Sequence, residues 1–448
     1  MRTHLIIVAL MLGAIGCADR TAPTSGPLSS PSLTGSIPEQ TDHPGERAYK
    51  ELARVVPSHG GLYFDTLTGD LNVYLKDLSE GPAAKRALPL IFGQALAGVL
   101  ARHPHAGIVF KQGTYTFIEL ARWRDALNDF FFETSSVQSW GIDHARNQLI
   151  VGVLSAADSQ AIVAKALELG VPEGALRLER TGRFQPETGR FQAETSLVDS
   201  IRPIEGGIQL EFEKSPSLPT QQCTLGFLAL WGGEHAFVTA SHCSSQELRL
   251  DSTKQFQPHS HVLPQNGSSI GFEVADSSFL CNHLDPHPCS YADAAVYRAT
   301  LGPGEWYFKR IAQTVSGCNP GCTPHAPLTI NSANPFWSIV RTEPTIVVGQ
   351  LVNKIGIGSG WTQGFVFYIN RSVKKDSSAY SDQAYADFQV EGGDSGSPVL
   401  LDILGGTDTT VTLGGILSGK IVGGPNDGLA VFSPWAGILR MYPGLRVN

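Results

Sequence analysis

The sequence predicts an all-β domain over residues 201–448, preceded by a smaller α+β domain over residues 46–180. Beyond residue 201, short apolar runs alternate with Gly, Pro, Asn and Ser turns, and no long amphipathic helix precedes the terminal segment 435–440. Residues 46–180 instead mix helical and strand spacings. The 448 residues are long enough for both domains.

The chain starts with the pattern of an export signal. Arg2 precedes an apolar run over residues 5–15 that is too short to span a bilayer and that ends in Ala-Ile-Gly-Cys. The small residue before Cys17 resembles a bacterial lipoprotein signal, in which that cysteine is lipidated after cleavage. An ordinary signal peptide that contains a cysteine is the alternative. Both interpretations predict a signal over residues 1–17 and an exported protein, either lipid-anchored in the bacterial cell envelope or secreted.

Residues 18–45 are expected to form a disordered tether, because they are rich in Ser, Thr, Pro and Gly. The overall composition is ordinary for a globular protein, with charged residues at 17%. The formal net charge is −8, and no basic cluster or nucleic-acid motif appears. The sequence therefore argues against a nucleic-acid partner, and it implies a membrane contact only through a lipid anchor.

The α+β domain is predicted from local spacing. A short helix over 46–54 precedes a hairpin whose apolar residues alternate on either side of a Thr-Gly-Asp turn. Strands are then expected over 108–117, 137–142, 149–153 and 175–178, with helices around Leu127 and Ala166. This order predicts a split βαβ, ferredoxin-like sandwich with its helices on one face. Its core candidates are Trp123, Leu127, Ile150 and Val153.

A tandem heptad follows this domain. The sequence reads TGRFQPE over 181–187 and TGRFQAE over 188–194. Polar and glycine residues at a domain end favour a linker, here assigned to residues 181–200. In such a flexible and exposed segment, Arg183 and Arg190 are expected to be open to cleavage.

A candidate nucleophile lies in the stretch VEGGDSGSPVL over 390–400, where glycines flank Ser395. A serine hydroxyl is a weak nucleophile unless a base takes its proton. His242 follows an apolar strand, and Asp293 precedes the apolar run Ala-Ala-Val-Tyr. A buried histidine beside a disulfide can be structural, and an aspartate before a strand is often a turn residue. The three together, in the order His, Asp, Ser, predict a catalytic triad.

These motifs resemble the chymotrypsin-like serine proteases, and within them the bacterial branch of α-lytic protease and the streptogrisins. The resemblance covers about residues 201–448 and is carried by TASHC, GGDSGSPV, CTLGF, LVNKIGIGSGWTQGFV and LGGILSG. It implies a Greek-key double β-barrel, a serine endopeptidase that acts through an acyl-enzyme, a protein or peptide substrate, and no cofactor. A catalytically silent protease fold used for binding is the alternative.

The resemblance also implies roles for individual residues. His242 would take the proton of Ser395, Asp293 would hold the imidazole, and the N–H groups of Gly393 and Ser395 would bind the oxyanion. The stretch IEGG from Ile204 is similar to the start of a mature enzyme, whose freed amine pairs with an aspartate in the trypsin branch. That aspartate would be Asp394 here. Arg202 precedes a proline, a poor bond to cleave, which argues against this mode of activation.

Six cysteines remain after Cys17, and an even number in an exported chain indicates disulfides. The resemblance pairs Cys223 with Cys243. Two further short loops would be closed by Cys281–Cys289 and Cys318–Cys322. The segment 281–289 also contains Cys281, His283, His287 and Cys289, and zinc is the alternative there, although the spacing matches no common zinc module.

Substrate preference is predicted from the residues of the expected cleft. Gln389 stands where a trypsin-like pocket places an aspartate, and Ser418 and Gly419 end the strand that would line the substrate cleft. None of these residues supplies a charge, which favours small or medium uncharged side chains. Lys420, just beyond, could instead attract an acidic one.

The α+β domain resembles the pro-regions that precede such bacterial proteases. A pro-region templates the folding of a barrel whose contacts are mostly non-local and which therefore forms slowly. The domain is accordingly expected to fold independently and to act as a folding template or an inhibitor; a retained accessory domain is the alternative. If Cys17 is lipidated, cleavage near residue 201 would also release the protease from its anchor.

Overall fold

The computed structural model describes residues 43–103, 105–187, 196–215, 220–258, 269–281, 287–317, 326–401, 403 and 409–447. The predicted signal, the tether up to residue 42, Cys17, Cys318 and Cys322 lie outside these residues. No helix within the described ranges is long and apolar enough to cross a membrane.

The first barrel is a seven-stranded antiparallel sheet in the order β10-β9-β13-β14-β17-β12-β11. The two inward-facing rings of Phe237 and Tyr297 stack at its centre, 5.2 Å apart. The strands are β9 (Gln209–Phe212), β10 (Gln221–Thr224), β11 (Phe227–Trp231), β12 (Glu234–Thr239), β13 (Lys254–Phe256), β14 (Ser269–Ala275) and β17 (Ala295–Ala299).

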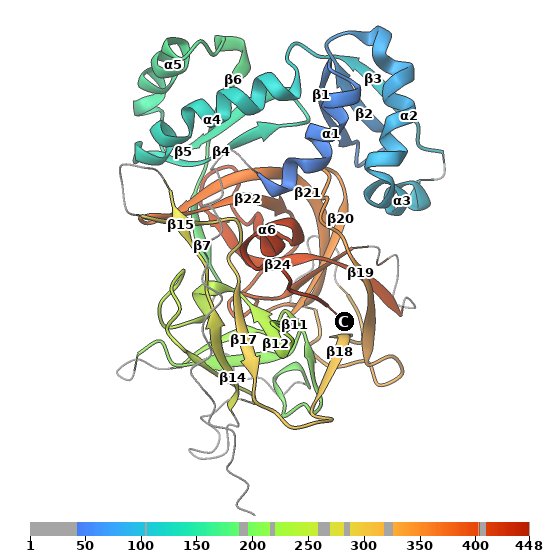
Figure 1. Ribbon diagram of the computed structural model, residues 1–448, viewed down its shortest axis with the longest axis vertical. Helices are drawn as coiled ribbons and strands as arrows, with labels where there is room; N and C mark the ends of the chain where they lie inside the picture. The colour runs from blue at the N-terminus through green and yellow to red at the C-terminus, as the bar shows by residue number, and fades with distance from the viewer. Residues whose placement is uncertain are drawn as a thin grey trace, which may run out of the picture. The chain divides into compact units, whose positions relative to one another are not determined.

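The second barrel closes on itself. Its strands run β22-β25-β24-β23-β20-β21, all antiparallel, and β21 pairs back onto β22. They are β20 (Leu351–Gly356), β21 (Gly360–Lys375), β22 (Ser378–Ala386), β23 (Pro398–Leu401), β24 (Thr410–Val422) and β25 (Ala430–Pro434). The predicted double β-barrel is therefore confirmed, and the predicted terminal helix is α6 (Trp435–Met441) (Figure 1).

Short strands connect the two barrels and extend their edges. The strands β18 and β19 pair with each other, β18 also pairs with β8, and β19 pairs with β24. Strand β15 pairs with β16, which continues onto β22. These strands are β8 (Ile204–Gly206), β15 (Phe279–Leu280), β16 (Pro288–Ser290), β18 (Trp306–Ala312) and β19 (Phe336–Thr342).

The first part of the α+β region is a three-stranded sheet, β1-β2-β3, with helices α1, α2 and α3. The predicted hairpin is present, because Phe64 pairs with Leu71 and His59 with Leu75. Helices α2 and α3 were not expected from the sequence, since α2 starts with Gly-Pro and contains Pro89. The elements are η1 (Pro44–Glu46), α1 (Arg47–Val55), β1 (His59–Phe64), β2 (Leu71–Leu75), η2 (Leu78–Glu80), α2 (Gly81–Ile91), α3 (Gly93–Arg102) and β3 (Ile108–Gln112).

The second part has the predicted order of elements but a different sheet. Strand β3 pairs with β2, whereas β4, β5 and β6 continue the sheet of the second barrel through the pairing of β4 with β21. The partner of β4 lies some 230 residues away in the chain, so local spacing could not reveal it. The elements are α4 (Phe117–Glu133), β4 (Val137–Asp143), β5 (Gln148–Val153), η3 (Ala156–Asp158), α5 (Ser159–Glu168), η4 (Glu173–Ala175) and β6 (Leu176–Arg180).

One hydrophobic core spans the α+β region and the second barrel. The predicted core residues Trp123, Leu127, Ile150 and Val153 are all buried. The cluster that contains Leu127 also includes Val366 and Phe432 of the barrel. The α+β region therefore shares its apolar interior with the barrel. This shared interior argues against the expectation that the region folds alone.

A buried group of charges joins the start of α1 to the barrel. His43 lies 2.5 Å from Asp382 of β22 and 3.4 Å from Asp125 of α4. Arg124 pairs with Glu46 and lies 2.6 Å from Asp125. Burial opposes the charged form of His43, but Asp382 and Asp125 raise its pKa to about 9. These charges hold the α+β region against β22.

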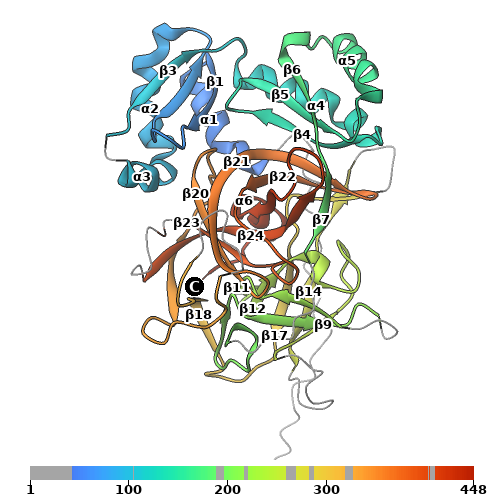
Figure 2. The same ribbon diagram turned by 180° about the vertical axis from the view of Figure 1, so that it is seen from behind.

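The last described strand before the barrels is β7 (Arg183–Pro186), which lies inside the expected linker. Figure 2 shows β7 running from the end of β6 toward the barrels. It pairs antiparallel with β24, from Arg183 opposite Val422 to Pro186 opposite Gly419. The described half of the tandem heptad is thus ordered, and Arg183 lies in a strand rather than in a flexible link.

Candidate active site

The predicted triad residues come together between the two barrels. His242 lies in the short helical turn η6 (Ser241–Cys243) after β12, Asp293 lies between β16 and β17, and Ser395 lies between β22 and β23. His242 Nε2 is 2.7 Å from Ser395 Oγ, and His242 Nδ1 is 2.7 Å from Asp293 Oδ2. All three are buried. This is the geometry in which an imidazole can take a proton from a serine hydroxyl.

Hydrogen bonds to both the side chain and the backbone of Asp293 fix its position. Its second carboxylate oxygen accepts the backbone N–H of His242 at 3.2 Å. Its own N–H donates to Ser433 Oγ at 2.9 Å, and that hydroxyl donates to Gln383. Ser418, predicted to line the cleft, lies 3.1 Å from the same hydroxyl and so belongs to the support of Asp293. The carboxylate can therefore hold the imidazole in one tautomer.

The turn around Ser395 needs glycine at two positions. Gly393 and Gly396 have φ values of 93° and 83°, which side-chain-bearing residues rarely adopt. A Cβ on Gly396 would also lie 2.1 Å from Thr239 Oγ1. The resulting backbone directs the N–H groups of Gly393 and Ser395 toward one acceptor, as an oxyanion site requires.

A buried lysine stabilises the same turn through an ion pair. Lys354 Nζ lies 2.8 Å from Asp394 Oδ2, and both side chains are fully buried. Asp394 also accepts from the Ser359 hydroxyl at 2.6 Å and from backbone N–H groups that include that of Gly358. Burial lowers the pKa of Lys354, and the Asp394 carboxylate opposes that shift. The partner expected for Asp394, a freed amine at Ile204, is thus replaced by a side chain of β20, and Ile204 lies within β8.

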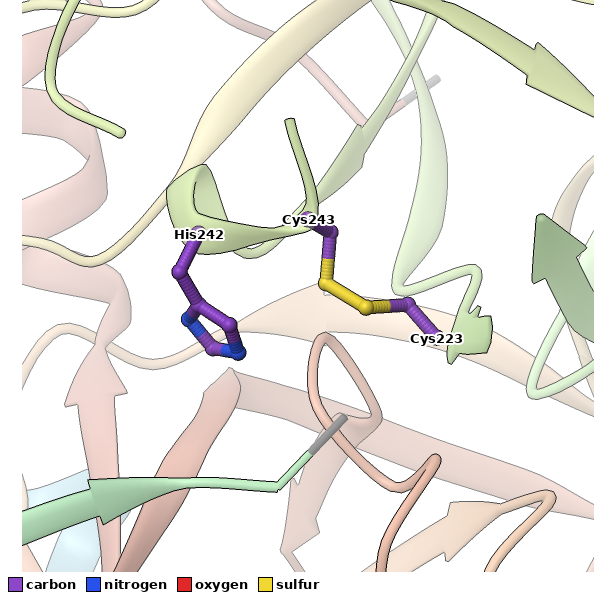
Figure 3. Close-up of side chains that lie close together, drawn as sticks. All are labelled: Cys223, His242 and Cys243. Carbon is purple, nitrogen blue, oxygen red and sulfur yellow. A yellow bond between two sulfur atoms is a disulfide. The ribbon is translucent and has the colours of Figure 1, made fainter. Parts of the chain in front are cut away.

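Figure 3 shows the disulfide of Cys223 and Cys243 beside the His242 ring. These three side chains are close enough to hold a metal ion. However, both sulfurs are in the disulfide, and the imidazole nitrogens face Asp293 and Ser395, so no ligand set is left. The bridge fixes β10 to η6 and thereby positions His242.

The second disulfide joins Cys281 and Cys289. Two of the four zinc ligands considered for this segment are therefore consumed as a disulfide. His283 and the predicted pair Cys318–Cys322 lie outside the described residues.

Ser241, which directly precedes His242, bonds to a buried carboxyl group. Its hydroxyl donates to Asp276 at 2.8 Å and accepts the N–H of Leu248 at 2.8 Å. Burial raises the pKa of Asp276 well above its ordinary value. The serine thus satisfies a buried carboxyl group near the triad.

The chain places its own backbone in the candidate site. Glu187 directly follows β7, and its carbonyl oxygen accepts the N–H of Gly393 at 2.7 Å and that of Ser395 at 3.4 Å. The N–H of Glu187 donates to Ser395 Oγ at 3.0 Å. A Cβ on Gly419 would lie 2.2 Å from the Gln185 carbonyl oxygen, so glycine allows β7 to approach β24. The segment lies along the cleft strand as an extended peptide.

The Glu187 side chain is also accommodated. It is buried, and its Oε1 lies 3.4 Å from Lys420 Nζ. Burial raises the pKa of the Glu187 carboxyl, while Lys420 acts against that shift. Lys420 also donates to the Val390 carbonyl at 3.3 Å. The backbone carbonyl of Gln389 accepts from the hydroxyls of Ser359 and Thr362, and the cleft role predicted for the Gln389 side chain stays a prediction.

Sequence reasoning identified the three candidate triad residues that the structure brings together, the two N–H groups that share one acceptor and two of the disulfides, but it missed Lys354 and Glu187. A lysine inside the otherwise apolar strand LVNKIG was a signal for a buried partner. The only sequence signal for Glu187 was the duplicated heptad, which ends both times in glutamate.

Solved structures of bacterial proteases are similar to part of the chain. Thermobifida fusca Protease A aligns at 20% identity with a TM-score of 0.35, over 55% of this chain and 97% of its own. A glutamic acid specific serine protease, described as using a histidine triad in substrate binding, aligns at 22% and 0.36, over 55% and 100%. Alpha-lytic protease homolog N4 aligns at 19% and 0.35, over 55% and 99%. No protein-family model and no curated protein matches the chain.

At these identities and TM-scores, the fold assignment depends on the strand order of the two barrels and not on the alignments. The barrels define a chymotrypsin-like serine protease fold.

Proposed function

We propose that the protein is an exported serine endopeptidase that hydrolyses peptide bonds through His242, Asp293 and Ser395. The observation that carries the proposal is that a pair of oxyanion-binding N–H groups and a serine–histidine hydrogen bond meet at one peptide group. The Glu187 carbonyl oxygen accepts hydrogen bonds from the N–H groups of Gly393 and Ser395. The Ser395 hydroxyl lies within hydrogen-bond distance of His242.

The reaction follows from these contacts. His242 Nε2 accepts the proton of Ser395 Oγ as the hydroxyl attacks the carbonyl carbon of the substrate. The oxyanion is stabilised by the two N–H groups, and Asp293 stabilises the imidazolium. The imidazolium then protonates the leaving amine, and water, activated by His242, hydrolyses the acyl-enzyme.

Export is part of the proposal. Disulfides such as Cys223–Cys243 persist in oxidising compartments, which agrees with the signal pattern at residues 1–17. Lipidation of Cys17 would anchor the protein to the membrane by its tether.

The α+β region is proposed to act as an inhibitor as long as β7 lies along β24. Strand β7 and Glu187 occupy the cleft strand and the oxyanion site, so another peptide cannot enter. This is a direct steric block.

Hydrolysis of an unstructured protein such as casein, followed by mass spectrometry of the fragments, tests the proposal. The Glu187→Lys variant places two cations side by side at Lys420, which should displace β7 and increase the rate. Ser395→Ala and His242→Ala in that background should lose at least about a thousandfold in activity. A silent binding module would give no fragments with any variant, and equal activity of the Ser395→Ala variant would also refute the triad.

A further inference from the structure

We propose that this barrel cleaves on the carboxyl side of glutamate, that Lys420 selects the glutamate side chain, and that the bond after Glu187 in the chain's own linker is a substrate. The inference rests on the proposed function and specifies its substrate class.

The backbone contacts assign Glu187 to the position before the cut. Four consecutive residues of β7 pair with β24 in one register, which places Pro186 opposite Gly419. The next residue, Glu187, then delivers its carbonyl to the oxyanion N–H groups. Shifting the register by one residue would turn every side chain of the strand to its opposite face. Only one residue can therefore present its carbonyl to Ser395 in this register.

The side-chain contacts assign the selectivity to Lys420. The Glu187 side chain is only 9% exposed, and its Oε1 lies 3.4 Å from Lys420 Nζ. The neighbouring carboxylates Glu391 and Asp394 act against a charged glutamate, as burial does. Lys354, the other nearby cation, is already paired with Asp394. Lys420 is therefore the group on which binding of a charged glutamate depends.

The sequence supplies the same recognition element twice. Phe-Gln-Pro-Glu-Thr ends the first heptad at Glu187, and Phe-Gln-Ala-Glu-Thr ends the second at Glu194. The barrel side of the chain is anchored directly afterwards, because Leu197 is buried in the core of the first barrel and its N–H donates to Leu328. A cut after either glutamate would break the covalent link between the α+β region and the barrels and leave that anchor intact.

The groups in the site account for every bond and proton that changes in the cleavage step. Ser395 Oγ bonds to the Glu187 carbonyl carbon while its proton passes to His242. The bond to the nitrogen of Thr188 breaks, and that nitrogen receives the proton from His242. Water then releases Glu187 as a carboxylic acid and restores Ser395. No other co-reactant is required.

The first experiment follows processing of the full chain by intact mass and amino-terminal sequencing. Wild-type protein should yield fragments that begin at Thr188 or Thr195, whereas Ser395→Ala should stay uncut. Glu187→Gln together with Glu194→Gln should slow processing about 10- to 100-fold, since a charged contact is lost and a neutral side chain of equal size remains. A matched Glu168→Gln variant, at an exposed glutamate of α5, should process normally. Processing of wild type at the arginines would overturn the proposal.

The second experiment measures selectivity in trans, in a Gly182→Val background, because a Cβ at Gly182 would lie 2.0 Å from the Val422 carbonyl oxygen and should displace β7 whatever residue stands at 420. Peptides with the sequence Phe-Gln-Pro-X-Thr-Gly carry Glu, Gln or Lys at X. The ratio of kcat/KM for Glu over Gln should exceed about 10 and fall to near 1 in Lys420→Met. Lys165→Met, an exposed lysine of α5, is the control and should keep the ratio. A ratio unaffected by Lys420→Met would refute the role of this lysine.

The two hypotheses fail differently. Efficient cleavage of casein after residues other than glutamate would refute the specificity and leave the protease intact. No cleavage of any substrate by wild type or by Glu187→Lys would refute the proposed function itself.

Discussion

Replacement of Lys354 by methionine tests what holds the catalytic turn. Lys354 and Asp394 form an ion pair of 2.8 Å with no exposed surface. Removing one partner of a buried pair leaves an uncompensated charge and typically costs about 3–5 kcal/mol. Asp394 keeps a hydroxyl donor in Ser359 and backbone donors, so the lower end, about 3 kcal/mol, is expected.

Urea unfolding in the Ser395→Ala background, which prevents self-cleavage, measures this loss. The double variant Lys354→Met, Asp394→Asn is the matched control, because it removes both charges and should recover most of the stability. In active protein, Lys354→Met should also lower hydrolysis more than tenfold, since Asp394 adjoins the oxyanion N–H groups. A single variant within about 1 kcal/mol of its parent, or a double variant as unstable as the single, would refute the reasoning.

Three further predictions concern the rest of the molecule. Folded protein binds a proton at His43 more tightly than unfolded protein, so the contribution of His43 to stability should be full below pH 6.5 and should fall by about 3 kcal/mol as pH rises through about 9. His43→Gln should flatten this part of the pH dependence in urea unfolding. A protein that starts at Ile201 should refold poorly, because β21 loses β4 and the shared core is opened, and adding residues 46–180 should restore the yield; efficient unaided refolding would discard the template role. Peptide mapping without reduction should find Cys223–Cys243, Cys281–Cys289 and Cys318–Cys322, and free thiols or stoichiometric zinc would contradict it.

The sequence was most informative where chemistry limits the choice of residue. The glycines around Ser395, the apolar strand before His242 and the buried position of Asp293 are each required locally, so the triad could be predicted without the fold. The barrel could be predicted from the same motifs and from the short apolar runs that alternate with turn residues after residue 201.

The features that escaped prediction depend on distant partners. Lys354 and Asp394 are 40 residues apart, and Glu187 and Ser395 are 208 residues apart. The heptad suggested a flexible linker because its polar residues have no local partner, yet β7 obtains its hydrogen bonds from β24. Lys420 was expected to be secondary to an uncharged cleft, and its proposed role in selectivity depends on Glu187, which the fold places beside it.

Covalent labelling of Ser395 by a fluorophosphonate tests the central claim most directly. The Glu187→Lys protein is treated with the probe and digested, and the peptide that contains Ser395 is examined by mass spectrometry. An activated serine should carry the probe at near-stoichiometric level, and His242→Ala in the same background should lose it, because the hydroxyl then has no base. An unlabelled Ser395, or labelling that is unchanged without His242, would contradict the account.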